Sequence, residues 1–109
     1  MGVWGLDIYD DDLAADLKEE FQGYIDEGME EEEAIEELMN NNDNLLDDDE
    51  DKGTFILTLA ALAKEYQVSN PKVKKMLNSL SRCSRYWNSI KEESQDLYDA
   101  RWELFRELN

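Results

Sequence analysis

The sequence predicts an all-α fold: a single compact irregular bundle of five to six helices, preceded by an N-terminal arm. Apolar residues recur at helical spacing along most of the chain, and no segment shows the alternation expected of a half-buried strand. With 109 residues, of which 41% are hydrophobic, the chain is long enough to bury a core of its own. We therefore expect one domain over residues 1–109.

The arm and the first helix are expected within the first 28 residues. Residues 1–9 hold two glycines around Trp4 and no sustained period, which favours an extended or turning arm. Asp10–Asp12 then supply a helix start, because a carboxylate accepts an orphan backbone N–H and meets the positive end of the helix dipole. Gly28 is expected to end this helix at the C′ position. Its apolar face comprises Leu13, Leu17, Phe21, Tyr24 and Ile25.

A second helix and a loop are expected before residue 52. Glu30–Glu33 open this helix, and the asparagine-rich run over residues 40–44 ends it. Residues 47–51 are all acidic and are predicted to form a solvated loop, with Leu45 and Leu46 held against the core. The inward face of the helix comprises Ala34, Ile35, Leu38 and Met39.

The second half begins with the most apolar segment of the chain. From Gly53 to Ala63 no charged residue occurs, which predicts a central helix that is buried on all sides. Asn70-Pro71 is a cap followed by proline at the first helical position, and it opens a fourth helix. A short segment with Tyr86, Trp87 and Ile90 follows, and Ser94 is expected to cap the last helix.

The distribution of charge is the strongest indication of function. The net charge is −17, but residues 1–51 carry 21 acidic residues and one basic residue, whereas residues 52–109 carry 7 acidic and 10 basic residues. Such asymmetry favours an interaction surface over uniform solubilising acidity. It argues against direct binding to nucleic acid or an anionic membrane, because both need clustered cations. The expected partner is a basic protein, either a toxin or a nucleic-acid-binding enzyme.

Catalysis, cofactors and metals are not expected. The chain has no histidine, the commonest general base at neutral pH, so we do not expect an enzyme. Residues 47–53 superficially match a calcium loop, but the glycine falls one position late and Thr58 stands where the bidentate glutamate is required. We therefore expect no dedicated metal site and no cofactor.

Cysteine content and hydropathy bear on the compartment. Cys83 is the single cysteine, so no internal disulfide can form, and the sequence shows neither a membrane span nor a secretory signal. A cytoplasmic location is expected.

Two kinds of residue leave alternatives open. Cys83 lies near Arg82 and Arg85, which would favour a reactive thiolate, but without a histidine partner a small apolar residue at a helix end is the favoured interpretation. The three tryptophans could anchor an interface. In a chain of this size we expect them mainly in the core.

The candidate contact residues are the acidic residues of the first two helices and the following loop. A solvated face kept for solubility is the alternative, but clustering acids costs repulsion that interspersed lysines would avoid. We expect the partner to contact Asp26, Glu27, Glu30, Glu31, Glu32, Glu36, Asp47, Asp48, Asp49 and Asp51.

The opening Met1–Gly5, followed by Asp10–Asp12, resembles a family of small uncharacterised bacterial proteins that begin Met-Gly-Ala-Trp-Gly. The similarity continues through Phe55–Ala63, Pro71–Lys74 and Trp87, although the stretch before Lys52 is unusually acidic here. The resemblance implies no functional residues. The scattered bacterial occurrence of the family implies at most a role in conflict between bacteria.

These observations favour an acidic protein-binding inhibitor, an immunity protein that neutralises a basic toxin or other enzyme by covering its active site. A second hypothesis is a phage or mobile-element antagonist that mimics DNA and occupies the channel of a nucleic-acid-binding defence protein. A third is a soluble adaptor whose acidic face only keeps it in solution. Competition with DNA separates the second from the first, and salt-sensitive capture of a partner separates the third from both.

Overall fold

The computed structural model describes residues 12–108, except for the side chains of residues 49 and 50. Within this range there are six α-helices, one 3₁₀ helix and no strand, so the all-α prediction is confirmed. The predicted arm at residues 1–9, with Trp4, lies outside the described residues. The elements are α1 (Asp12–Asp26), α2 (Glu31–Asn41), η2 (Asp43–Asp47), α3 (Asp49–Glu65), α4 (Pro71–Leu80), α5 (Ser84–Glu93) and α6 (Gln95–Leu108).

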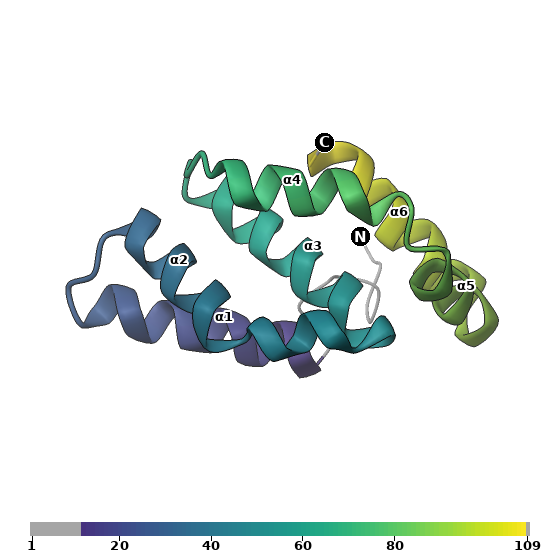
Figure 1. Cartoon of the computed structure of the whole chain (residues 1–109), viewed down its shortest axis with the longest axis horizontal. Coiled ribbons are helices and arrows are strands. Elements are labelled where there is room, and N and C mark those ends of the chain that lie inside the picture. Colours follow the sequence, from purple (N-terminus) through teal and green to yellow (C-terminus); the bar gives the residue numbers. More distant parts are fainter. Residues whose placement is uncertain (1–11, 109) are drawn as a thin grey trace.

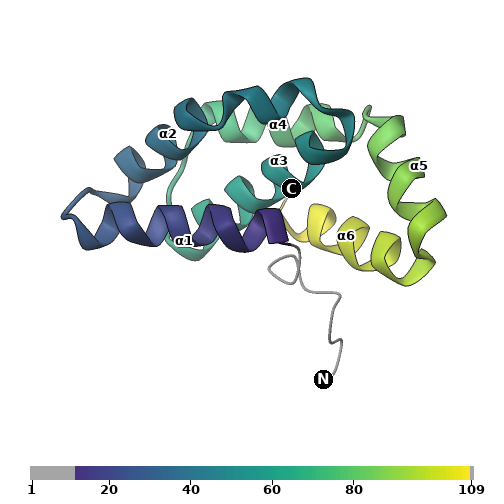
Figure 2. The ribbon, with the colours of Figure 1, turned by 90° about the horizontal axis from the view of Figure 1, so that it is seen from below.

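The central helix of the bundle is α3, which contacts η2 and all five other α-helices. Figure 1 shows α1 and α2 on one side of α3, α4 alongside it, and α5 with α6 at the far end; Figure 2 gives the perpendicular view. The molecule measures 40 × 30 × 22 Å along its principal axes. As predicted, α3 is buried around its circumference, including Phe55, Ile56, Leu57, Leu59 and Leu62.

The start of α3 differs from the prediction. The helix begins at Asp49 rather than Gly53, so the expected loop over residues 47–51 is wrong in its second half. The physical reason is local: Oδ1 of Asp48 accepts the backbone N–H of Asp51 at 3.1 Å, so the carboxylate acts as a helix cap. Leu45 and Leu46 in η2 are half-buried against the core, as expected.

The turn between α1 and α2 has a defined backbone structure. Gly28 has φ +97°, as expected for a C′ glycine, and its N–H donates to the carbonyl of Ile25 at 3.0 Å. The N–H of Met29 donates to the carbonyl of Tyr24 at 3.0 Å. These two bonds form a Schellman motif, which reverses the chain tightly.

The caps of the second half lie where the sequence predicted them. Oδ1 of Asn70 accepts the N–H groups of Lys72 and Val73 at 2.9 and 3.3 Å, at the start of α4. Oγ of Ser94 accepts the N–H of Leu97 at 3.2 Å, at the start of α6. Both helices therefore begin at residues whose side chains satisfy orphan amide groups.

A cluster of aromatic rings joins α5 to α6. Trp87 is buried, and its ring meets those of Trp102, Tyr98 and Phe105 edge-on at centroid distances of 4.9, 5.9 and 5.8 Å. The indole N–H of Trp87 donates to the carbonyl of Leu80 at 2.9 Å. Trp87 is therefore a core residue, as expected, and Trp102 is half-buried beside it.

One buried cation was not expected. The side chain of Arg101 on α6 is only 4% exposed, and its Nη1 donates to the hydroxyl of Tyr86 at 2.8 Å and to Oγ1 of Thr54 at 3.0 Å. Because these partners lie on α5 and α3, the guanidinium group ties three helices together.

Candidate functional site

Five of the predicted contact residues surround the α1–α2 turn. We call Asp26, Glu27, Glu30, Glu31 and Glu32 the acidic turn surface, and the structure exposes all five. The Schellman motif at Gly28 positions them, because it folds the last residues of α1 back toward the first residues of α2. Residues 26–37 hold eight acidic residues and no basic one. The local potential is therefore strongly negative.

The acidic surface continues along α2. A hollow of about 340 Å³ lies on this helix, lined by Glu32, Glu33, Glu36, Glu37 and Asn40. The prediction omitted Glu33 and Glu37, although their spacing of one helical turn indicated that they share a face. Among the described residues, no group of three or more Asp, Glu or Cys side chains is arranged to hold a metal ion.

Glu36 differs from the other predicted contact residues because its carboxylate forms a hydrogen bond and a salt bridge within the protein. Its carboxylate accepts the side-chain amide of Asn70 at 2.7 Å and the ammonium group of Lys72 at 3.2 Å. The hydrogen bond from Asn70, followed by that from Lys72, holds the pKa of Glu36 below its ordinary value. Glu36 therefore ties α2 to the start of α4, and it is a weaker candidate for partner contact than its neighbours.

The other end of α2 is fixed by a polar cluster. The hydroxyl of Tyr24 donates to Glu20 at 2.5 Å and accepts the side-chain amide of Asn41 at 2.7 Å, while Asn42 donates to Glu20 at 3.2 Å. Burial first, and then the bond to Glu20, raises the pKa of Tyr24 above its ordinary value. The helix that carries the acids is thus held to α1 at both ends.

The remaining four candidate residues lie elsewhere. Figures 1 and 2 place the α1–α2 turn at one end of the long axis and the first turn of α3 well away from it. Asp47 and Asp48 are exposed at the end of η2, and Asp51 is half-buried in α3; the side chain of Asp49 lies outside the described residues. The ten candidates therefore form two groups rather than one continuous flank.

A family comparison places the chain among related sequences. The family described as a domain of unknown function (DUF4259) matches residues 2–106. The chain belongs to this family. The match covers the described helical bundle except for the last two residues of α6, and it agrees with the expected relationship to a family of uncharacterised proteins. No curated protein and no solved structure matches the chain.

Apolar side chains also occur within the acidic turn surface. Met29 lies between Glu27 and Glu30 and is half-buried against the core, as is Ile25 one turn before it. A partly exposed methionine surrounded by carboxylates offers an adaptable apolar contact. The turn therefore combines exposed carboxylates with partly exposed apolar side chains.

Cys83 lies at the start of a helix, and its surroundings bear on whether its thiol is reactive. Cys83 is half-buried at the N-cap of α5, and its Sγ lies 3.7 Å from the carbonyl of Ser79. This position agrees with the interpretation of a small residue at a helix end.

None of the helices between residues 12 and 108 has the length and apolar character that crossing a bilayer requires.

Proposed function

We propose that this chain is an acidic inhibitor of the immunity type, which neutralises a basic toxin or other enzyme by covering its active site with the acidic turn surface. The observation that carries the proposal is the cluster of eight acids without a base in the sequence over residues 26–37, of which six are exposed and Glu36 and Glu37 are half-buried, built on a helix fixed at both ends. A preorganised surface binds at low entropic cost. The cytoplasmic location and the specific Met-Gly-Ala-Trp-Gly likeness stay predictions beside it.

The energetics of α2 support a binding role over simple solubility. Glu32 with Glu36, and Glu33 with Glu37, are like-charged pairs one turn apart, and such pairs cost about 0.2–0.5 kcal/mol each. Only Glu36 is offset by a salt bridge among the described residues, to Lys72. A partner that supplies cations would relieve this repulsion on binding.

The proposed mechanism separates encounter from retention. The negative field of the turn surface steers a basic partner into contact and raises the association rate. Met29, which lies between Glu27 and Glu30 in the sequence and is half-buried, then enters an apolar recess of the partner and slows dissociation. The inhibitor performs no chemistry of its own in this scheme.

The test compares two triple charge reversals of equal size. Glu27→Lys, Glu30→Lys and Glu31→Lys together invert the turn surface, whereas Glu92→Lys, Glu93→Lys and Asp96→Lys change the same charge at exposed positions of α5 and α6. Each immobilised protein is used to capture basic proteins from its host, and the association rate and activity of the captured protein are measured. We expect the turn variant to associate at least about tenfold more slowly, and the control to behave as wild type.

Three results would contradict the proposal. If both triple variants lost binding equally, the net charge of the protein, and not the position of the acids, would control association. A captured protein whose activity is unchanged would favour the soluble adaptor. If duplex DNA competed with this chain for one groove of the captured protein, the DNA mimic would be favoured instead.

A further inference from the structure

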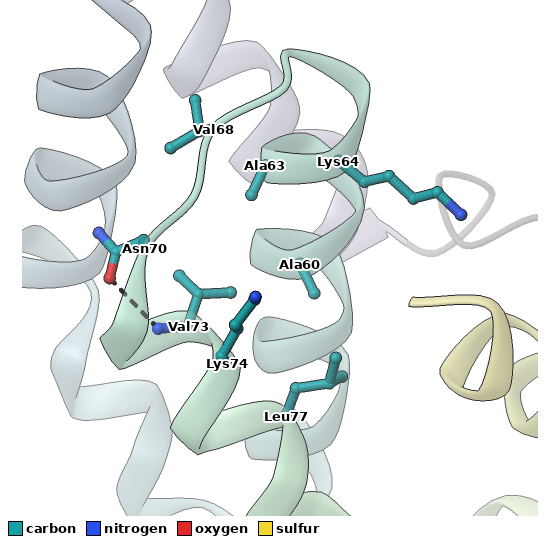
Figure 3. Close-up of a pocket in the computed structure, with 8 residues that line it drawn as sticks. All are labelled: Ala60, Ala63, Lys64, Val68, Asn70, Val73, Lys74 and Leu77. Atoms are coloured by element: carbon teal, nitrogen blue, oxygen red, sulfur yellow. Dashed lines mark hydrogen bonds between the residues drawn. The ribbon is translucent and has the colours of Figure 1, made fainter. Parts of the chain in front are cut away.

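A cleft between α3 and α4 differs in character from the acidic turn surface. Its floor is apolar and buried, made by Ala60 and Ala63 of α3 and by Val73 and Leu77 of α4 (Figure 3). Ala60 and Ala63 lie about one helical turn apart, so two small side chains face α4 together and leave space between the helices. Val68 and Asn70 close one end, where the hydrogen bond from the N–H of Val73 to Asn70 begins α4.

The size of the cleft limits what it can hold. Its volume is about 180 Å³, whereas clefts that bind cofactors or drug-sized ligands occupy roughly 300–1,000 Å³. It is close to the roughly 150 Å³ of an apolar cavity that accepts benzene. The cleft therefore suits a single aliphatic or aromatic side chain.

The charge of the rim indicates what should stand next to that side chain. Lys64 and Lys74 border the cleft, and none of the described residues that line it is acidic. In Figure 3 the side chain of Lys74 extends across the front of the cleft, while Lys64 points away, with its Nζ 3.2 Å from the carbonyl of Glu107. The sequence of α4 contains three lysines and no acid. A carboxylate adjacent to the inserted side chain would meet Lys74.

A second copy of this chain is a poor occupant. Each copy carries a net charge of −17, so self-association would oppose two strongly negative molecules. A short segment of another protein with one aliphatic residue beside one or two carboxylates satisfies both the apolar floor and the basic rim, and its small charge meets far less repulsion than a second copy would.

We propose that the α3–α4 cleft is a docking site for an acidic peptide segment of a partner protein, with one aliphatic side chain inserted between the two helices and a neighbouring carboxylate paired with Lys74. The site is independent of the proposed inhibitory function, because it selects the opposite charge on its ligand. In this binding mode, one side chain of the peptide inserts into the groove between two helices.

Selection from a displayed library of random peptides on the immobilised full chain tests the proposal. Each enriched peptide is then measured against three variants: Ala63→Leu, which fills the cleft; Lys74→Glu, which reverses the rim; and Lys75→Glu, which makes the same charge change at an exposed position outside the cleft. Circular dichroism shows whether each variant folds. If Ala63→Leu does not fold, the comparison of Lys74→Glu with Lys75→Glu still tests the proposal, because both lysines are exposed.

The expected result is enrichment of peptides with an aliphatic residue beside aspartate or glutamate. Ala63→Leu and Lys74→Glu should each weaken their binding by about tenfold or more, and Lys75→Glu should weaken it much less. Amide resonances of Val73 and Leu77 should shift on titration. Equal weakening by Lys74→Glu and Lys75→Glu would overturn the proposal. So would a selection that yields only basic peptides bound equally by wild type and Ala63→Leu.

Discussion

The ring of Tyr86 in α5 lies directly against the backbone of Gly53 in α3. A Cβ atom placed on Gly53 would lie 2.3 Å from Cδ2 and Cε2 of that ring, closer than any real contact permits. Glycine at this position is therefore required by the approach of a neighbouring helix, not by the backbone conformation of α3. The hydroxyl of the same tyrosine accepts a hydrogen bond from Nη1 of Arg101 at 2.8 Å.

Replacing Gly53 with alanine should destabilise the protein. The added methyl group must displace the Tyr86 ring, and overpacking of a core typically costs about 1–3 kcal/mol. Gly23→Ala is the matched control, because nothing lies within 4 Å of a Cβ added there and Gly23 is exposed in α1. That substitution should stabilise the helix by about 0.5–1 kcal/mol. Urea unfolding of both variants measures the two effects; a Gly53→Ala protein as stable as Gly23→Ala would contradict the proposed contact.

Gln67 should be replaceable by glycine with a gain in stability. The end of α3 is a second Schellman motif, in which the N–H of Val68 donates to the carbonyl of Ala63 at 2.7 Å and Gln67 takes the left-handed position with φ +57°. A side chain is disfavoured there, so Gln67→Gly should raise the free energy of unfolding by about 0.5–1 kcal/mol.

Gly28→Ala provides the reciprocal measurement. Gly28 occupies the same position at the end of α1, with φ +97° and open space around it, so an alanine there is strained without any clash. The stability of this variant should fall by about 1 kcal/mol. Thermal melts in which both substitutions move the midpoint in the same direction would show that the left-handed conformation does not control stability at these turns.

The sequence predicted best those features that depend on local signals. Gly28, Asn70 and Ser94 each satisfy backbone groups within a few residues, and each lies where it was expected. The central helix was expected from Gly53 because the uncharged apolar run begins there, whereas the role of Gly53 itself depends on Tyr86, which is distant in sequence. No local pattern could have revealed that contact.

Arg101 and the acidic residues also have surroundings that depend on contacts distant in sequence, which local patterns do not reveal. Arg101 lies one turn from both Leu97 and Phe105, so helical spacing puts it beside apolar residues, whereas an arginine is usually exposed. Its acceptors come from two other helices. The acidic residues at 26–32 and 47–51 were grouped by composition, yet the length of α2 and the path of η2 keep them apart.

Two glutamates on α2 should respond oppositely to neutralisation. Glu37 lies one turn after Glu33, outside the first turn of the helix, and has no salt bridge within the described residues, so Glu37→Gln should stabilise the protein by about 0.2–0.5 kcal/mol. Glu36 bonds Asn70 and Lys72, so Glu36→Gln should destabilise it, by less than about 1 kcal/mol because the pair is exposed to solvent. Chemical denaturation at neutral pH measures both.

The effect at Glu36 should depend on pH with a defined sign. Its pKa in the folded protein lies below the ordinary value of 4.5, so its contribution is complete above that pH and is lost as the pH falls through the folded-state pKa. The difference in stability between wild type and Glu36→Gln should therefore shrink below pH 4.5. A difference that persisted unchanged in acid would show that the charge of Glu36 contributes nothing.

Removing the hydroxyl of Tyr86 should weaken the junction of α3, α5 and α6. Nη1 of Arg101 donates to that hydroxyl at 2.8 Å and to Thr54 at 3.0 Å, and all three side chains are at most 5% exposed. Tyr86→Phe deprives a buried cation of one acceptor without changing the ring that packs on Gly53, so about 1–3 kcal/mol should be lost. Tyr98→Phe is the control, because Tyr98 is half-buried and packs on Trp87 and Trp102 through its ring. If both variants unfold at the same denaturant concentration, the stabilising role lies in the rings alone, and Arg101 is held by its packing rather than by its hydrogen bond to Tyr86.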